Sequence, residues 1–135
     1  MGLSLHNIER PTAMALSIID KLERETAQKT IEDTHGSFGL KYVDIASALD
    51  VDRRTLLRYR KLKNTPVPEV RDRLEALRQI AFLIDELFSH REDGLAWLYQ
   101  AVPQLQGRRP IDLIRKGKLD EVLSILAGLY SGAHS

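Results

Sequence analysis

Six cations and no acid lie within a short window near the middle of the chain. They are Arg53, Arg54, Arg58, Arg60, Lys61 and Lys63. This window has a formal charge of +6, whereas the whole chain carries +1, so the remaining residues sum to −5. Clustered guanidinium and ammonium groups neutralise phosphates and release counterions from DNA. The chemistry that the window indicates is therefore binding to a polyanion.

A helix is the element that would direct these cations to one side. Arg54, Arg58 and Lys61 have the spacing i, i+4, i+7, which forms one stripe along a helix. Leu56 and Tyr59 share the opposite face. Like charges at this spacing destabilise an isolated helix by about a few tenths of a kcal/mol each. A phosphate backbone would remove that penalty, so the stripe favours a surface that meets nucleic acid.

The residues just before this stripe fit the first helix and turn of a helix-turn-helix. Ala46 lies where two crossing helices come closest, and Asp50 lies at a turn position where positive φ is usual and Asp is tolerated. Asp52 is a suitable N-cap for the second helix. The apolar contact positions are Ile45, Leu49, Val51, Leu56 and Tyr59. Residues 42 to 61 therefore predict the helix pair that commonly inserts into the major groove of DNA.

From this pattern we expect operator double-stranded DNA as one partner. The predicted DNA-binding residues are Arg53, Arg54, Thr55, Leu57, Arg58 and Lys61. Two alternatives remain open at this point. The helix pair could serve as a protein-docking module, or the charge run could be a solvated basic face on an ordinary helical core.

Composition favours an all-α fold and excludes several classes of protein. The hydrophobic fraction of 43% suffices for a core, and Leu, Ala, Arg, Lys and Glu are plentiful helix formers. No cysteine is present, which fits a reducing compartment. The apolar run from Ala13 to Ile19 lacks a basic leader and a cleavage site, so we expect no signal peptide. No apolar stretch approaches the length of a membrane span. We expect a cytoplasmic location.

No catalytic constellation emerges from the sequence. His6, His35, His90 and His134 are scattered without the spacing of metal ligands. No glycine-rich phosphate loop is present either. We therefore expect a binding protein rather than an enzyme, with no metal and no cofactor.

Two long helices are predicted around the basic segment. The first spans residues 11 to about 33, and its expected core face is Ala15, Ile18, Ile19, Leu22 and Thr26, with a break at His35 to Gly39. The second spans residues 68 to 88 and carries a heptad seam: Val70, Leu74, Leu77, Ala81, Ile84 and Phe88. The seam fits either a core helix or a dimer contact. The prolines at 66 and 68 are expected to end the basic helix.

Three short helices are expected in the last third of the chain. They span residues 94 to 100, residues 110 to 116 and residues 118 to about 131, with a loop at 102 to 109. Gly117 suits the left-handed position that closes the middle helix. Arg109 and Asp112 lie three residues apart around a proline-initiated turn. We expect them to satisfy each other and to hold the local fold.

The last third resembles the toxin-binding domain of Xre/MbcA/ParS antitoxins. The family pattern runs from Trp-Leu through a proline-containing loop to Leu-Gly-Gly-x-Arg-Pro, an apolar Asp-Leu-Leu turn, Gly and a final apolar helix. The matching residues here are Trp97, Leu98, Pro103, Leu105, Gly107, the run 109 to 114, Gly117, Val122, Leu126 and Gly132. Two departures are Ala101-Val102-Pro103 in place of Pro-Asn-Pro and Gln106 in place of the first glycine of the pair.

This resemblance implies an antitoxin of a type II toxin–antitoxin system. Its expected partner is a RES-domain toxin that consumes NAD or transfers ADP-ribose, and the complex is expected to repress its own operon. The family's C-terminal region covers the entrance to the toxin's active site. The residues to which that role would fall are Leu126, Leu129, Tyr130, Gly132, Ala133, His134 and Ser135.

The expected organisation is an Xre-like helix-turn-helix region at 1–65, a connecting core helix at 66–90 and a toxin-binding domain at 91–135. A homodimer is expected, with the heptad seam and the last helix as candidate contacts. One alternative is a stand-alone helix-turn-helix transcription regulator with a C-terminal dimerisation domain. Another is an antitoxin whose helix pair no longer binds DNA.

Overall fold

The computed structural model describes residues 12–133, and this part of the chain is helical apart from turns and one isolated bridge. The helices are α2 (Ala13–Phe38), α3 (Tyr42–Leu49), α4 (Arg53–Arg60), α5 (Pro68–Leu87), α6 (Arg91–Tyr99), the 3₁₀-helix η1 (Pro103–Leu105), α7 (Pro110–Arg115) and α8 (Leu119–Ala133). The all-α prediction is confirmed. Within residues 12–133, no helix has the length and apolar character needed to cross a membrane.

Helix α2 continues past the point where the sequence predicted its end. The expected break at His35 to Gly39 was wrong, because Gly36 faces solvent and costs about 1 kcal/mol at most. Burial of Phe38 at the last turn outweighs that cost. The helix ends instead at Gly39, whose φ of 69° is the left-handed conformation that glycine adopts without strain.

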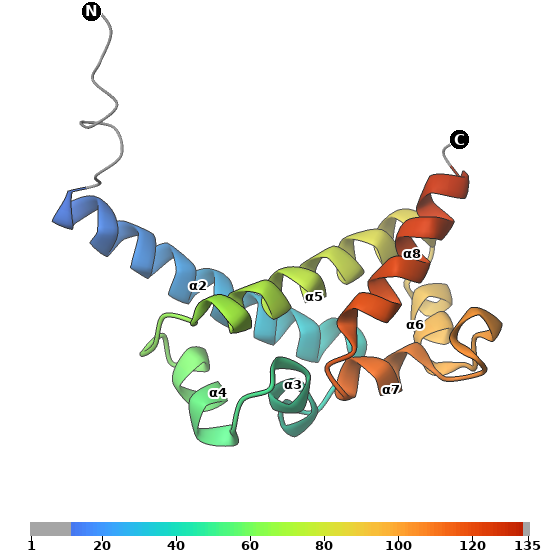
Figure 1. Ribbon diagram of the computed structural model, residues 1–135, viewed down its shortest axis with the longest axis horizontal. Helices are drawn as coiled ribbons and strands as arrows, with labels where there is room; N and C mark the ends of the chain where they lie inside the picture. The colour runs from blue at the N-terminus through green and yellow to red at the C-terminus, as the bar shows by residue number, and fades with distance from the viewer. Residues whose placement is uncertain (1–11, 134–135) are drawn as a thin grey trace, which may run out of the picture.

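Helix α5 is the central element of the fold. Figure 1 shows it crossing the molecule, with α2 along its first half and α8 against its second half. The positions that it buries are Val70, Leu74, Leu77, Ile80 and Ile84. Most of the heptad seam is therefore used inside the chain. Of the two interpretations that the sequence left open, the core helix is the one observed.

The short helices of the last third lie against α3 and α5. Ile111, Leu113 and Ile114 of α7 are buried, and α7 packs against both α3 and α8. Arg115 adds an ion pair to Asp44 of α3, with 3.5 Å between Nε and Oδ2. One continuous cluster of buried side chains therefore runs from α2 through α5 to α8.

Arg109 and Asp112 form the structural pair that the sequence predicted. Arg109 donates from Nε to Oδ2 of Asp112 at 2.8 Å and from Nη2 to Oδ1 at 2.9 Å. Arg115 donates to the same carboxylate at 3.1 Å. The hydrogen bonds from Arg109 contribute most to holding the pKa of Asp112 below its ordinary value. The pair fixes the first turn of α7, which Pro110 opens.

The loop before α7 departs in sequence from the Xre/MbcA/ParS pattern. Two of its residues adopt the left-handed conformation. Gln106 has a φ of 56° and Gly107 a φ of 77°. Gln106 occupies the position where the family has glycine, and a left-handed non-glycine residue costs roughly 1–2 kcal/mol. The backbone N–H of Gln106 donates to the Pro103 carbonyl, and that of Gly107 donates to the Val102 carbonyl. These hydrogen bonds help to hold the strained position.

Replacement of Gly117 by alanine is expected to destabilise the fold by about 1–2 kcal/mol. Gly117 has a φ of 76°, and an added Cβ would lie 3.0 Å from Nη1 of Arg73 and 3.3 Å from the Ala48 carbonyl oxygen. Chemical denaturation measures the change. Gly128→Ala is the matched control, because Gly128 is helical with open space around it. That substitution is expected to stabilise the protein, and an equal loss for both variants would contradict the prediction.

Candidate functional site

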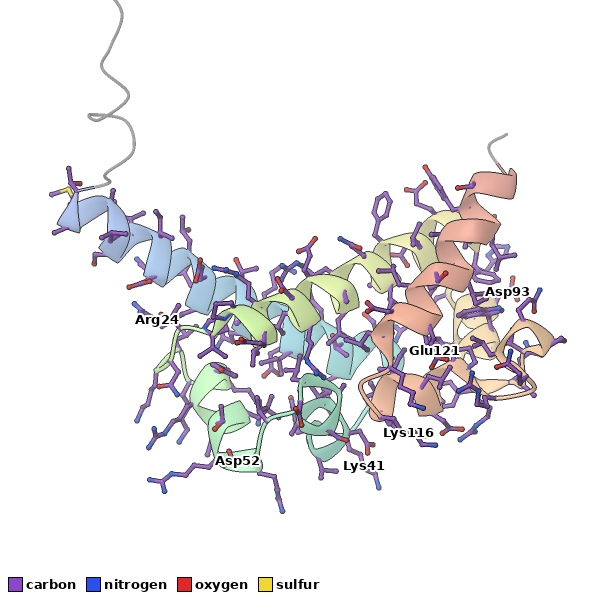
Figure 2. The ribbon with its side chains drawn as sticks, viewed as in Figure 1. Arg24, Lys41, Asp52, Asp93, Lys116 and Glu121 are labelled. Carbon is purple, nitrogen blue, oxygen red and sulfur yellow. The ribbon has the colours of Figure 1, made fainter. Side chains whose placement is uncertain are left out.

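The turn between α3 and α4 has the backbone geometry that the sequence predicted. Asp50 adopts φ 56° and ψ 47°, and its N–H donates to the carbonyl oxygens of Ala46 and Ser47. Asp52 caps α4, because its Oδ1 accepts the backbone N–H of Thr55 at 2.7 Å. That backbone hydrogen bond is the main reason why the pKa of Asp52 lies below its ordinary value. Figure 2 shows Asp52 at the tip formed by this turn.

The packing of the two helices also follows the sequence pattern. The buried contact positions are Ile45, Ala46, Leu49, Leu56 and Tyr59. Val51 in the turn is half-buried against the same core. Because Leu56 and Tyr59 anchor one face of α4, the residues between them are directed outward.

The outward face of α4 carries most of the predicted DNA-binding residues. Arg53, Arg54, Arg58 and Lys61 are exposed. Among residues 12–133, none of these four side chains forms an ion pair or a side-chain hydrogen bond. Leu57 lies among them with 43% of its surface exposed, and Thr55 is half-buried beside the cap. The face therefore combines free positive charge with one apolar side chain.

Arg60 differs from the other cations of the window because it is paired. Its Nε lies 2.8 Å from Oε1 of Glu32, and its guanidinium carbon lies 3.6 Å from the ring centroid of Tyr42. Gln28 donates to the Arg60 carbonyl at 2.8 Å. Arg60 thus attaches α4 to α2 and α3. The charge directed outward is smaller than the sequence window indicated.

Helix α4 ends earlier than the prolines predicted. Its C-cap is Lys61, and Leu62 adopts a left-handed φ of 61°. The N–H of Lys63 then donates to the Arg58 carbonyl at 2.9 Å, which closes the last turn. The prediction that Pro66 and Pro68 end the helix was wrong, because this hydrogen-bonded turn stops it first. Lys61 still lies at the edge of the basic face.

Two further lysines extend the positive surface beyond α4. Figure 2 places Lys41, before α3, and Lys116, after α7, on the same lower side of the molecule as Asp52. Both are exposed. The sequence pattern did not predict them, because the two lysines are far apart in the chain and belong to no charge run. The contact between α3 and α7 places both on one side of the molecule.

The attachment of α4 through Glu32 predicts a specific response to acid. Burial raises the pKa of Glu32, but hydrogen bonds from Arg60 and Tyr42 outweigh it and leave the pKa below 4.5. A lowered folded pKa adds stability that is present above the unfolded value and is lost as the pH falls through the folded pKa. We expect Glu32→Gln to unfold at lower temperature than wild type near neutral pH. The two melting curves should converge on acidification.

Thermal unfolding followed between about pH 3 and pH 7 tests this response. Glu25→Gln is the matched control, because Glu25 is an exposed carboxylate on the same helix. The control should lose stability on acidification as wild type does. A constant gap between Glu32→Gln and wild type at every pH would contradict the prediction.

The residues predicted to bind a toxin differ in how exposed they are. Leu126 is fully buried in the core, so its prediction as a contact residue is corrected: it supports α8 from within. Leu129 is 40% exposed, Tyr130 is half-buried, and Gly132 and Ala133 are exposed. His134 and Ser135 lie outside the described residues. Figure 1 shows the end of α8 extending past α5, which gives an accessible apolar end.

Comparison with known proteins relates this arrangement to toxin–antitoxin systems. No protein-family model matches the chain. A chain of the crystal structure of the Mycobacterium tuberculosis MbcT–MbcA toxin–antitoxin complex has the same fold. The TM-score is 0.55 at 24% identity, covering 78% of this chain and 94% of that one. The fold is thus one found in a toxin–antitoxin complex.

Sequence relatives define the family more closely. A probable mycobacterial cidal antitoxin of M. tuberculosis is 31% identical over 113 residues, which is 84% of this chain and 96% of that protein. The mycobacterial cidal antitoxin MbcA of Mycobacterium bovis is 24% identical over 103 residues, covering 76% of this chain and 90% of that protein. The chain belongs to the mycobacterial cidal antitoxin family.

Proposed function

We propose that this protein is the antitoxin of a type II toxin–antitoxin system and that it binds and neutralises a RES-domain toxin. The observation that carries the proposal is the 31% identity to a probable antitoxin along 96% of that protein's length. The likeness of fold to a chain of the MbcT–MbcA complex supports it. The RES-type partner, which consumes NAD or transfers ADP-ribose, is implied by the resemblance of residues 97 to 132.

The toxin-binding surface in this proposal is the exposed end of α8. Leu129 offers an apolar side chain beside Gly132 and Ala133, whose small size lets another protein approach the backbone. Leu119, Val122 and Leu126 hold the same helix against the core, so its far end is presented on a rigid support. His134 and Ser135 complete the segment that would enter the toxin's active-site entrance.

The second activity in this proposal is repression of the antitoxin's own operon through α4. The support is an outward face of unpaired cations on a helix whose opposite face is anchored in the core. Phosphate contacts by such cations provide affinity, and base-edge contacts in the major groove provide specificity. We retain the division into a DNA-binding region at 1–65, a connecting helix at 66–90 and a toxin-binding part at 91–135. The complex would act in the cytoplasm.

Co-expression with the protein encoded by the neighbouring gene, which we expect to be a RES-domain toxin, tests the proposed function. We expect this chain to restore growth and to purify in a stable complex with the toxin. The alternative is a stand-alone transcription regulator whose last third serves dimerisation. DNA binding without rescue and without complex formation would favour that alternative and overturn the antitoxin proposal.

A further inference from the structure

The corner between α7 and α8 carries two exposed lysines. Lys116 and Lys118 flank Gly117, and within the part of the chain that the structure describes neither forms an ion pair or a side-chain hydrogen bond. Backbone groups close this corner. The N–H of Lys118 donates to the Leu113 carbonyl at 2.9 Å, and that of Gly117 donates to the Ile114 carbonyl at 3.0 Å. The corner therefore forms without help from the two lysine side chains.

This corner lies directly against the first helix of the helix pair. A Cβ added to Gly117 would lie 3.3 Å from the carbonyl oxygen of Ala48 and 3.7 Å from that of Ser47, both in the last turn of α3. Arg73 of α5 donates to the same Ala48 carbonyl at 3.4 Å. These close contacts fix the position of the corner relative to α3, and α3 in turn packs against α4.

Several acids near the corner already have cationic partners. Arg115 lies 3.5 Å from Asp44 of α3 and 3.1 Å from Asp112 of α7. Arg108 lies 3.2 Å from Glu121 of α8. Arginines rather than the corner lysines therefore hold these three carboxylates.

The remaining exposed acids leave an excess of positive charge at this side of α3. Asp120 lines a separate groove between η1 and α8. Asp50 lies in the turn after α3 and is exposed. Lys41, before α3, is exposed as well, and Figure 2 places it on the same lower side as Lys116. With Lys118, three lysines thus stand against the one carboxylate of Asp50.

Three helices form a row along the side of the molecule that carries these cations. Figure 1 shows α4, α3 and α7 in this order beneath α2 and α5, and α3 contacts both of its neighbours. Packed helices lie about 8–10 Å apart, so α7 lies roughly 16–20 Å from α4. The major groove of DNA is only about 12 Å wide. A duplex that receives α4 in its major groove therefore presents its phosphate backbone, rather than the same base edges, to the corner.

We propose that Lys116 and Lys118 bind the phosphate backbone of the duplex whose major groove receives α4. The proposal rests on the proposed DNA binding and extends that surface into the part of the chain assigned to the toxin. Lysine ammonium groups on flexible stems suit phosphate contacts, which add affinity without reading sequence. DNA is favoured over an acidic protein surface because the same side of the molecule carries Lys41 and the start of α4 at Asp52.

Fluorescence anisotropy with the full chain tests this contact on two duplexes of equal length, the promoter region of its own gene and a scrambled sequence. Replacement of Lys116 and Lys118 by alanine should weaken binding to both on the order of tenfold at about 0.15 M salt. The slope of log K against log salt should fall by about 1–2, since each phosphate contact contributes about 0.9. The ratio of the two affinities should stay unchanged, because phosphate contacts carry no sequence information.

The matched control combines Lys21→Ala with Lys29→Ala, which removes the same charge from exposed positions on α2. This control should leave the salt slope unchanged. Unchanged circular dichroism and melting temperature of both double variants would exclude misfolding.

Methylphosphonate substitution locates the contact on the DNA. Each duplex carries one neutral linkage in place of a phosphate, and the linkage is moved along both strands. At one position or more, the neutral linkage should weaken wild type at least about threefold and leave the variant of Lys116 and Lys118 unaffected, since one phosphate contact is already lost in that variant. Linkages contacted from α4 should weaken both proteins.

Three outcomes overturn the proposal: an unchanged salt slope in the corner variant, an equal loss in the α2 control, or no linkage that distinguishes the corner variant from wild type. Loss of the toxin complex with DNA affinity intact would assign the two lysines to an acidic surface of the toxin. When wild type binds DNA, each of these results removes only the corner contact and leaves α4 as the DNA-binding helix. A wild type without affinity for either duplex would overturn the proposed DNA binding and the corner contact together.

Discussion

Replacement of both Arg54 and Arg58 by alanine is expected to weaken operator binding on the order of 30-fold at about 0.15 M salt. Both side chains are exposed on the outward face of α4 and form no ion pair within residues 12–133. Each lost phosphate contact also reduces the slope of log K against log salt by about 0.9. The double variant should therefore reduce it by about 2, with the fold unchanged.

Fluorescence anisotropy over a salt series measures both quantities. Lys29→Ala is the control, because Lys29 is exposed on α2 and pairs with Asp33 rather than facing outward from α4. It should leave the slope unchanged. If one of the two arginines contacts a base, its single variant should instead cost about 1–3 kcal/mol and relax specificity at one position. Binding that survives both substitutions would remove α4 as the DNA-contacting element.

The distribution of charge around α4 explains why this face is free. Asp52, at the start of α4, accepts the backbone N–H of Thr55. Glu32 accepts hydrogen bonds from Arg60 and Tyr42. Neither acid forms an ion pair with Arg54 or Arg58, although the charges of these two arginines help to lower the pKa of Asp52. An incoming phosphate would meet charges that the fold leaves without a partner.

The sequence predicted most of the helices because local signals determine them. The spacing of Leu56 and Tyr59, the cap at Asp52 and the left-handed Gly117 are all encoded within a few neighbouring residues. The errors arose where distant contacts decide. Whether Gly36 interrupts α2 depends on burial of Phe38, and the pairing of Arg60 depends on a carboxylate 28 residues away.

The same distinction applies to the candidate sites. Periodicity identifies an apolar face but does not say which element covers it. The heptad seam of α5 and the expected core face in the first half of α2 both predicted burial. The fold buries most of the seam, whereas Ile18, Ile19 and Leu22 of α2 are exposed. On α8 the pattern likewise placed Leu126 and Leu129 together. The structure directs the first into the core and leaves the second accessible.

That accessible end of α8 is where the largest effect on toxin neutralisation is expected. Deletion of residues 131–135 should abolish rescue of growth in co-expression with the toxin while leaving DNA binding unchanged. The helix keeps its buried residues Leu119, Val122 and Leu126 after this deletion, so the fold should persist. Growth curves and size-exclusion chromatography of the mixed proteins measure rescue and complex formation.

A point substitution tests the contact at the end of α8 without shortening the chain. Leu129→Asp should weaken the complex by at least about 2 kcal/mol, roughly 30-fold. An apolar anchor in the centre of an interface contributes that much to binding. A carboxylate buried there without a partner adds a further penalty. Ala127→Asp introduces the same charge on another exposed face of α8 and should bind as wild type does. Full neutralisation by the truncated chain or by Leu129→Asp would move the toxin contact away from the end of α8. The antitoxin role itself would still be judged by complex formation with the intact chain.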